Sequence, residues 1–188
     1  MPHVVLTGFM ASGKTAIGRR LARRLGYDFI DTDVMIEEKA GCSIPDLFKR
    51  EGEAGFRQME RDTIAALALA QPTVIATGGG TFVDADNRAA LHRLGTVVCL
   101  VTSPEIILER VGRSDKRPLA SGPDAAETLA KLYESRLPFY RMADVMVETD
   151  GLSVEQAAAR VAAAIAPRLK HAGRTEAQHA HAVEAKKP

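Results

Sequence analysis

Five short apolar runs alternate with longer helical patterns along this 188-residue chain, and this alternation constrains the fold more than any other feature. Apolar strands that are separated by helices form a parallel sheet with helices on both faces. The expected strands lie at 3–8, 27–33, 72–80, 96–103 and 144–150. The expected helices lie at 14–25, 33–40, 45–51, 53–70, 85–93, 103–112, 125–136 and 153–166. The sequence therefore predicts a three-layer α/β protein with a five-stranded parallel sheet.

Size and charge favour a single domain that binds a small ligand. The length slightly exceeds that of a usual domain, and a hydrophobic content of 46% is enough for a real core. Twenty-five Lys and Arg against 24 Asp and Glu give a net charge of +1, which does not predict a broad basic surface for nucleic acid. With only six Phe, three Tyr and no Trp, a base-stacking surface is not expected either. We expect one domain over 1–169 and no nucleic-acid partner.

Neither the ends of the chain nor its cysteines indicate a membrane segment, a disulfide or a metal site. No run of eighteen apolar residues is present and the first residues lead directly into a strand, so a cytoplasmic protein without membrane contact is expected. Cys42 and Cys99 lack CxxC spacing, which argues against a zinc site or a disulfide framework. Residues 170–188 are polar without an apolar period, and they are predicted to be disordered. Three histidines in this segment are interpreted as solvated residues in preference to a weak metal site.

Residues Gly8–Thr15 form the motif that carries the chemistry. The segment GFMASGKT fits the pattern GxxxxGK[ST], and it begins where the first strand ends and the first helix starts. Its glycines let backbone N–H groups turn toward a phosphate, and the helix N-terminus adds a partial positive charge. Lys14 would neutralise the outer phosphates, and the Thr15 hydroxyl would coordinate Mg²⁺. The motif predicts a nucleoside triphosphate ligand.

Asp31 and Asp33 are the candidate acidic residues near the metal. The third and fourth strands end in VIATGGG and CLVTSP, so neither supplies the carboxylate that usually holds Mg²⁺ beside such a loop. Carboxylates at positions i and i+2 leave the second strand in the same direction, close to the phosphate loop. The alternative is that one of them only caps the next helix, although one residue could do both. A GTPase is a minor alternative because no NKxD segment is present.

Two further segments suggest substrate contacts. In GEAGFRQME, Arg57, Glu60 and Arg61 would lie on one helix face, so that Glu60 can orient Arg57; a surface ion pair is the alternative. The run Gly78–Gly80 directly follows the third strand. Three glycines provide no packing, so a close approach of the backbone to a ligand is favoured over a plain flexible turn.

Six motifs resemble those of shikimate kinases in order and rough spacing. They are GFMASGKT (8–15), DTD (31–33), GEAGFRQME (52–60), TGGG (77–80), KRPL (116–119) and RLPFYRMAD (136–144). The match extends from Val4 to about Ala166. It implies a P-loop NTPase fold of the NMP-kinase type, with substrate-binding helices at about 33–61 and a mobile lid at about 112–124. The implied reaction is Mg²⁺-dependent transfer of the ATP γ-phosphoryl group to the 3-hydroxyl of shikimate, by a cytoplasmic monomer in chorismate and aromatic amino acid biosynthesis.

The resemblance also implies roles for individual residues. Those for the nucleotide are Ala11, Ser12, Gly13, Lys14, Thr15, Ala16, Arg110 and Arg117. Those for shikimate are Asp33, Arg57, Gly79, Gly80 and Arg136, with Ile44, Phe48 and Phe56 as walls around the ring. Lys14, Asp33 and Arg117 would be catalytic, with Asp33 contacting the ring hydroxyls and accepting a proton and Arg117 closing over the phosphates. Thr15 and Asp31 would hold Mg²⁺, the latter through water. Arg110 would pack on adenine, and Arg57 and Arg136 would bind the substrate carboxylate.

The chain departs from the usual motifs of this family at three places. Ala11 stands where the family usually has Gly, Thr15-Ala16 replaces the usual Ser-Thr, and the loop 149–153 lacks an arginine that some members place there.

A kinase for another polyol acid, such as gluconate, is the nearest rival among enzymes. A nucleotide-dependent switch without transfer activity is the rival from another class. Two arginines suited to one carboxylate favour an acidic ring but do not identify it.

Overall fold

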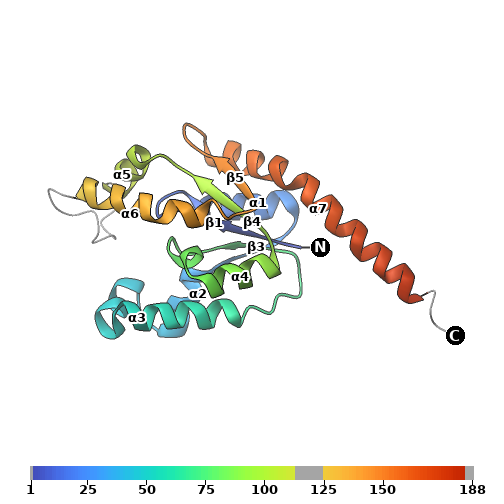
Figure 1. Ribbon diagram of the computed structural model, residues 1–188, viewed down its shortest axis with the longest axis horizontal. Helices are drawn as coiled ribbons and strands as arrows, with labels where there is room; N and C mark the ends of the chain where they lie inside the picture. Colours follow the sequence, from blue (N-terminus) through green and yellow to red (C-terminus); the bar gives the residue numbers. More distant parts are fainter. Residues whose placement is uncertain (1, 113–124, 185–188) are drawn as a thin grey trace.

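One sheet of five parallel strands forms the centre of the computed structural model, which describes residues 2–112 and 125–184 (Figure 1). The strand order is β2-β3-β1-β4-β5. The strands are β1 (His3–Thr7), β2 (Asp28–Asp31), β3 (Thr73–Ala76), β4 (Gly95–Val101) and β5 (Val145–Glu148). The five predicted strands are confirmed, although several are shorter than expected. Because all five strands are parallel, their carboxyl ends meet at one edge, where the ligands of such sheets bind.

Helices cover both faces of the sheet, as the alternation of the sequence predicts. Helices α1 (Lys14–Leu25) and α7 (Val154–Glu184) cover one face. Helices α3 (Ile44–Ala65), α4 (Ala85–Leu94), α5 (Pro104–Gly112) and α6 (Ala125–Tyr140) contribute to the core on the other. Successive residues of β1 point to opposite faces, so Val4 and Leu6 pack with α1 and α7, whereas Val5 packs in the second core.

The segment after β2 forms a small helical unit beside the sheet. Helix α2 (Thr32–Ala40) packs on α3 through Ile36, Leu47 and Phe56. Gly52, with a φ of 69°, interrupts the helical backbone inside α3, which explains why the sequence predicts two helices there. The second part ends at Ala65 and not at 70, since Leu67 and Leu69 instead pack against the core as part of the connection to β3.

Two helices are longer than predicted. Helix α6 continues past 136 to Tyr140, with Pro138 in its last turn, where the missing N–H removes one i→i−4 hydrogen bond just before the helix ends. The prediction of a disordered segment over 170–188 is wrong for residues 170–184, because α7 continues to Glu184. This stretch is rich in Ala, Glu, Gln, Lys and Arg, which favour helix even without an apolar face, and it extends beyond the sheet (Figure 1). Residues 185–188 lie outside the described part. Within the described part, no helix is both long and apolar enough to span a membrane.

Candidate active site

The loop between β1 and α1 has the backbone geometry of a phosphate cradle. Gly8 has a φ of 134°, and a Cβ there would lie 2.6 Å from the Leu100 carbonyl oxygen, so only glycine fits. Ala11, with a φ of 59°, is the one non-glycine residue with positive φ in the described ranges. The buried Lys14 ammonium donates to the carbonyl oxygens of Gly8 (2.9 Å) and Phe9 (2.8 Å). The lysine is thus held against the loop whose ligand it is predicted to neutralise.

Thr15 and Asp31 are brought together as the sequence predicts. The Thr15 hydroxyl donates to Oδ2 of Asp31 at 2.6 Å. Oδ1 of Asp31 accepts from the Asp33 backbone N–H at 3.0 Å, which makes Asp31 the N-cap of α2. Asp31 therefore does have the capping role that was its alternative interpretation, and one of its oxygens faces Thr15 at the same time. A hydroxyl and a carboxylate are hard oxygen donors of the kind that Mg²⁺ binds together with phosphates and water, so this pair fits a magnesium ion.

Asp33 is enclosed by other acidic groups. Burial first, and then the nearby charges of Asp31, Glu60 and Glu37, raise the pKa of its carboxyl, and together with the opposing effect of Lys14 they bring it to about 6. Its Oδ1 is buried and has no hydrogen-bond partner among the described residues. A Cβ at Gly78 would lie 2.6 Å from this oxygen, so the glycine run passes directly beside the carboxyl. An unpartnered buried carboxylate oxygen is suited to accept a hydrogen bond from a ligand hydroxyl.

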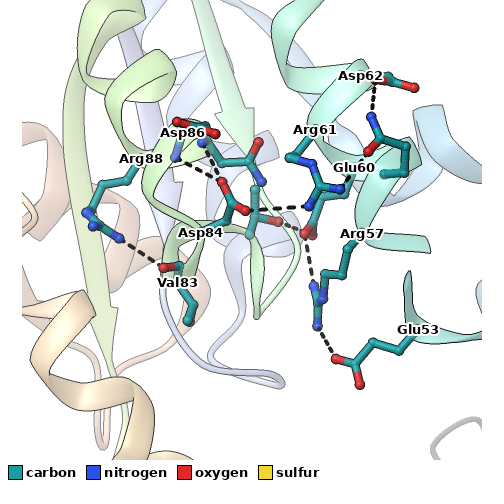
Figure 2. Close-up of polar contacts among 12 residues, drawn as sticks. Glu53, Arg57, Glu60, Arg61, Asp62, Val83, Asp84, Asp86 and Arg88 are labelled. Carbon is teal, nitrogen blue, oxygen red and sulfur yellow. Dashed lines mark hydrogen bonds and ion pairs between the residues drawn. The ribbon is translucent and has the colours of Figure 1, made fainter. Parts of the chain in front are cut away.

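Arg57 is oriented by Glu60, as predicted from their spacing in the helix (Figure 2). Nη1 of Arg57 lies 2.9 Å from Oε2 of Glu60, whose side chain is only 1% exposed. The other oxygen of Glu60 accepts from the Thr81 hydroxyl at 2.6 Å. A Cβ at Gly80 would lie 2.8 Å from Nη1 of Arg57, so the guanidinium lies directly against the glycine run. Arg61 takes a different direction and pairs with Asp84 at 3.6 Å.

Arg136 reaches the same glycine run from helix α6. Its Nη1 donates to the Gly79 carbonyl oxygen at 3.4 Å, and its guanidinium lies 5.6 Å from the centre of the Phe9 ring. Arg57 lies against Gly80, and Arg136 against Gly79, so two helices far apart in sequence direct guanidinium groups at adjacent residues. Such a pair of fixed cations is suited to a carboxylate.

An aromatic wall adjoins this polar cluster. The rings of Phe48 and Phe56 stack with their centres 4.7 Å apart, and Ile44 packs against the same apolar cluster. Phe56 is buried, whereas Phe48 is partly exposed. The predicted wall residues thus form one group, held by α3 and located beside Arg57, which lies 5.1 Å from the Phe56 ring centre.

A cavity of about 260 Å³ lies on the other side of the phosphate loop. It is lined by Ala11, Ser12, Gly13, Ile17, Arg110, Thr149, Leu152, Val154 and Ala157. Arg110, the residue expected to pack on adenine, donates to the Ala11 carbonyl oxygen at 3.0 Å and so lies beside the phosphate loop. The sequence does not identify Ile17 and Ala157 as cavity residues, because they belong to no motif and have the spacing of ordinary core positions. Arg117 and the predicted lid after Gly112 lie outside the described residues.

Two more residues at the site were missed at first. The Thr81 hydroxyl supports Glu60, and the Tyr140 hydroxyl donates to the Gly79 carbonyl oxygen. Tyr140 lies in the motif 136–144 and Thr81 directly follows the motif 77–80, yet nothing in either pattern predicts these long-range bonds. Among residues 2–112 and 126–169, whose side chains the structure describes, no group of three or more His, Cys, Asp or Glu could hold a metal ion.

Comparisons with known proteins agree with this geometry. The profile of the family described as shikimate kinase matches residues 10–166. A shikimate kinase of Moorella thermoacetica is 43% identical over 170 residues, which are 90% of this chain and 93% of that protein. The solved structure of a shikimate kinase from Acinetobacter baumannii in complex with shikimate has a TM-score of 0.84 and 38% identity, and covers 89% of this chain and 94% of that one.

A more distant solved structure is similar in fold only. A gluconokinase from Sinorhizobium meliloti has a TM-score of 0.60 at 16% identity, over 93% of this chain and 97% of that one. At this level of identity the likeness concerns the shared kinase fold and not the substrate.

Proposed function

Because this chain belongs to the shikimate kinase family, we propose that the residues around its phosphate loop divide phosphoryl transfer among them as follows. The enzyme transfers the γ-phosphoryl group of ATP to the 3-hydroxyl of shikimate, yielding shikimate 3-phosphate and ADP in chorismate biosynthesis. The observation that carries the residue assignment is the convergence of Arg57 and Arg136 on Gly79 and Gly80.

The P-loop residues bind the phosphates of ATP. Ser12, Gly13, Lys14, Thr15 and Ala16 surround the start of α1, where backbone N–H groups and the helix terminus favour anions. Lys14 neutralises the outer phosphates, and the cavity lined by Ala11 and Arg110 receives the adenine. Arg117 retains the role over the phosphates that the KRPL motif implies. Phosphoryl transfer depends mainly on such positioning and charge neutralisation.

Thr15 and Asp31 would hold the Mg²⁺ ion, Asp31 through water. The hydroxyl and the carboxylate already lie 2.6 Å apart at the mouth of the loop. When bound there, the ion supplies positive charge that stabilises the charge developing on the phosphates. Because Oδ1 of Asp31 caps α2, its other oxygen, Oδ2, stays directed toward Thr15.

Asp33 acts on the hydroxyl that attacks the phosphoryl group. Its buried Oδ1 has no partner in the described part of the chain, and so can accept the hydrogen of a ring hydroxyl. A carboxylate within hydrogen-bond reach of the nucleophile orients it and takes its proton in the transfer step. The glycine run beside Asp33 leaves room for the ring to approach the backbone.

Arg57 and Arg136 bind the carboxylate of shikimate, and the stacked phenylalanines form one side of the ring site. A planar guanidinium is always charged at neutral pH and can bind a carboxylate through two hydrogen bonds. Action as a cytoplasmic monomer is proposed from the family alone.

The test is an ADP-release assay with shikimate, gluconate and simple nucleoside monophosphates as acceptors. Turnover with shikimate only is expected. Turnover with gluconate at comparable kcat/KM would contradict the assignment of the two arginines to a ring carboxylate. A lack of transfer to every acceptor would favour the nucleotide-dependent switch.

A further inference from the structure

Tyr140 brings a buried hydroxyl from the end of helix α6 to the substrate site. The side chain is 2% exposed, and its ring packs in the core with residues such as Phe9 and Leu129. Its only polar atom donates a hydrogen bond to the carbonyl oxygen of Gly79, 61 residues away in sequence. Burial raises the pKa of the phenol, so the hydroxyl remains protonated and a donor throughout the physiological range.

The Gly79 carbonyl receives a second, weaker bond from Arg136. The distance from Nη1 of Arg136 is 3.4 Å, beyond the usual range for an N–H···O hydrogen bond. Arg136 and Tyr140 lie four positions apart on one helix, so their side chains share a face and reach the same carbonyl. The two side chains are also joined to each other by a hydrogen bond, so the phenol is a direct neighbour of the guanidinium. On its other side, Gly79 lies against the phosphate loop, since a Cβ there would be 3.0 Å from the Met10 nitrogen.

We propose that Tyr140 is a positioning residue for the shikimate site, where its hydroxyl satisfies the Gly79 carbonyl and so leaves the Arg136 guanidinium available to the substrate carboxylate. This inference rests on the roles proposed above for Gly79 and Arg136. Without the hydroxyl, the carbonyl would depend on Arg136 as its donor, and the guanidinium would be drawn toward the backbone. Binding of the carboxylate would then compete with that bond, while the nucleotide side of the loop would be unaffected.

The test compares two Tyr→Phe variants on the same helix. Tyr140→Phe removes the bonded hydroxyl and keeps the buried ring. Tyr133→Phe is the control: its ring contacts Phe9 edge-on, with centres 5.4 Å apart, but its hydroxyl has no hydrogen-bond partner in the described part of the chain. Melting temperatures establish that both variants fold. As the protein has no Trp, shikimate affinity is measured by calorimetry in addition to steady-state KM.

Loss of one buried hydrogen bond predicts that Tyr140→Phe raises the KM and Kd for shikimate about three- to tenfold. The KM for ATP should stay within about twofold, and Tyr133→Phe should match the unmodified enzyme for both substrates. An unchanged shikimate KM in Tyr140→Phe would overturn the proposal. So would an equal rise in both KM values, because that pattern indicates a general structural defect.

Arg136→Ala separates this inference from the function on which it rests. If the shikimate KM does not rise in Arg136→Ala, the carboxylate role of Arg136 is wrong, and the inference fails with it. If it rises there but not in Tyr140→Phe, the inference alone fails. In the double variant, the effect of Tyr140→Phe should largely disappear, because a residue that acts through Arg136 has little to act on once Arg136 is absent. If the effects of Tyr140→Phe and Arg136→Ala on the shikimate KM were fully additive, Tyr140 would not act through Arg136.

Discussion

The Thr81 hydroxyl donates to Oε1 of Glu60 at 2.6 Å, and the same carboxylate binds Arg57 through its other oxygen. Glu60 is almost fully buried, so its charge needs partners on both sides. Thr81 lies directly after the glycine run, which means that one carboxylate ties the end of that run to the arginine lying against it. The geometry of Arg57 thus depends on Thr81 through the carboxylate of Glu60.

Replacing Thr81 by Val should weaken shikimate binding without affecting ATP. The substitution keeps the shape of the side chain but leaves one oxygen of Glu60 without its donor, which predicts a rise in shikimate KM of about three- to tenfold. Thr81→Ser restores a hydroxyl and should recover most of the loss. Steady-state kinetics with each substrate varied in turn provides the measurement. If Val and Ser variants behave alike, the hydroxyl is not what orients Arg57.

Asp33→Asn should abolish most turnover while ATP still binds. The amide keeps the size of the side chain and can still contact a hydroxyl, but it cannot accept a proton. We expect kcat to fall by about 100-fold or more, the usual range for loss of a general base. Calorimetric binding of ATP should remain within about twofold of the unmodified enzyme. A kcat within tenfold of the original would argue that Asp33 only orients the substrate.

The two roles of Asp31 can be separated by two substitutions. Asn caps helices about as well as Asp, so Asp31→Asn should retain stability but raise the Mg²⁺ concentration for half-maximal activity about tenfold. Asp31→Ala removes the cap as well and should lower stability by about 1 kcal/mol, or roughly 2–4 °C in Tm. Activity is titrated with Mg²⁺, and Tm is read from thermal unfolding. Identical Mg²⁺ requirements in Asp31→Asn and the unmodified enzyme would contradict a role near the metal.

The local patterns predicted the parts of the site that lie within one element. The P-loop motif, Asp31 after β2 and the Arg57–Glu60 pair are each encoded in a few neighbouring residues, and the structure has them as expected. The bonds of Thr81 and Tyr140 were not predictable in this way. They join α3 to the segment after β3, and α6 to that same segment, so they depend on how the helices pack in three dimensions.

The end of α7 shows a different reason for an incorrect prediction. An apolar period reports that a helix is packed against a core, and residues 170–184 have no such period. A prediction from the apolar period alone therefore overlooks their helix-favouring composition. A helix that continues past the body of the protein can lack an apolar face and still be favoured by its composition (Figure 1).

Deleting residues 170–188 should therefore reduce helix content but not catalysis. The residues that make the described contacts at the proposed site all precede residue 170. We expect kcat and both KM values to remain within about twofold, since surface changes of this kind seldom affect a remote site. The far-ultraviolet circular dichroism signal at 222 nm should fall in proportion to the helical residues removed. An unchanged helix signal would show that residues 170–184 are not helical in solution, and a loss of activity would give the segment a role in catalysis.

A hydrogen bond between the first and third strands should make stability depend on pH. The Thr73 backbone N–H donates to Nδ1 of His3 at 3.2 Å, which requires that nitrogen to be unprotonated. Burial lowers the pKa of His3 below its ordinary 6.5, so the folded state binds this proton less readily than the unfolded state. The stabilisation is therefore fully present above about pH 6.5 and is lost as the pH falls through the lower pKa of the folded protein.

His3→Asn keeps an acceptor in place of Nδ1 but does not titrate. Between pH 7.5 and 5.5, the Tm of the unmodified protein should fall more than that of His3→Asn, because all other titrating groups are common to both. Parallel declines in Tm would show that protonation of His3 does not oppose folding.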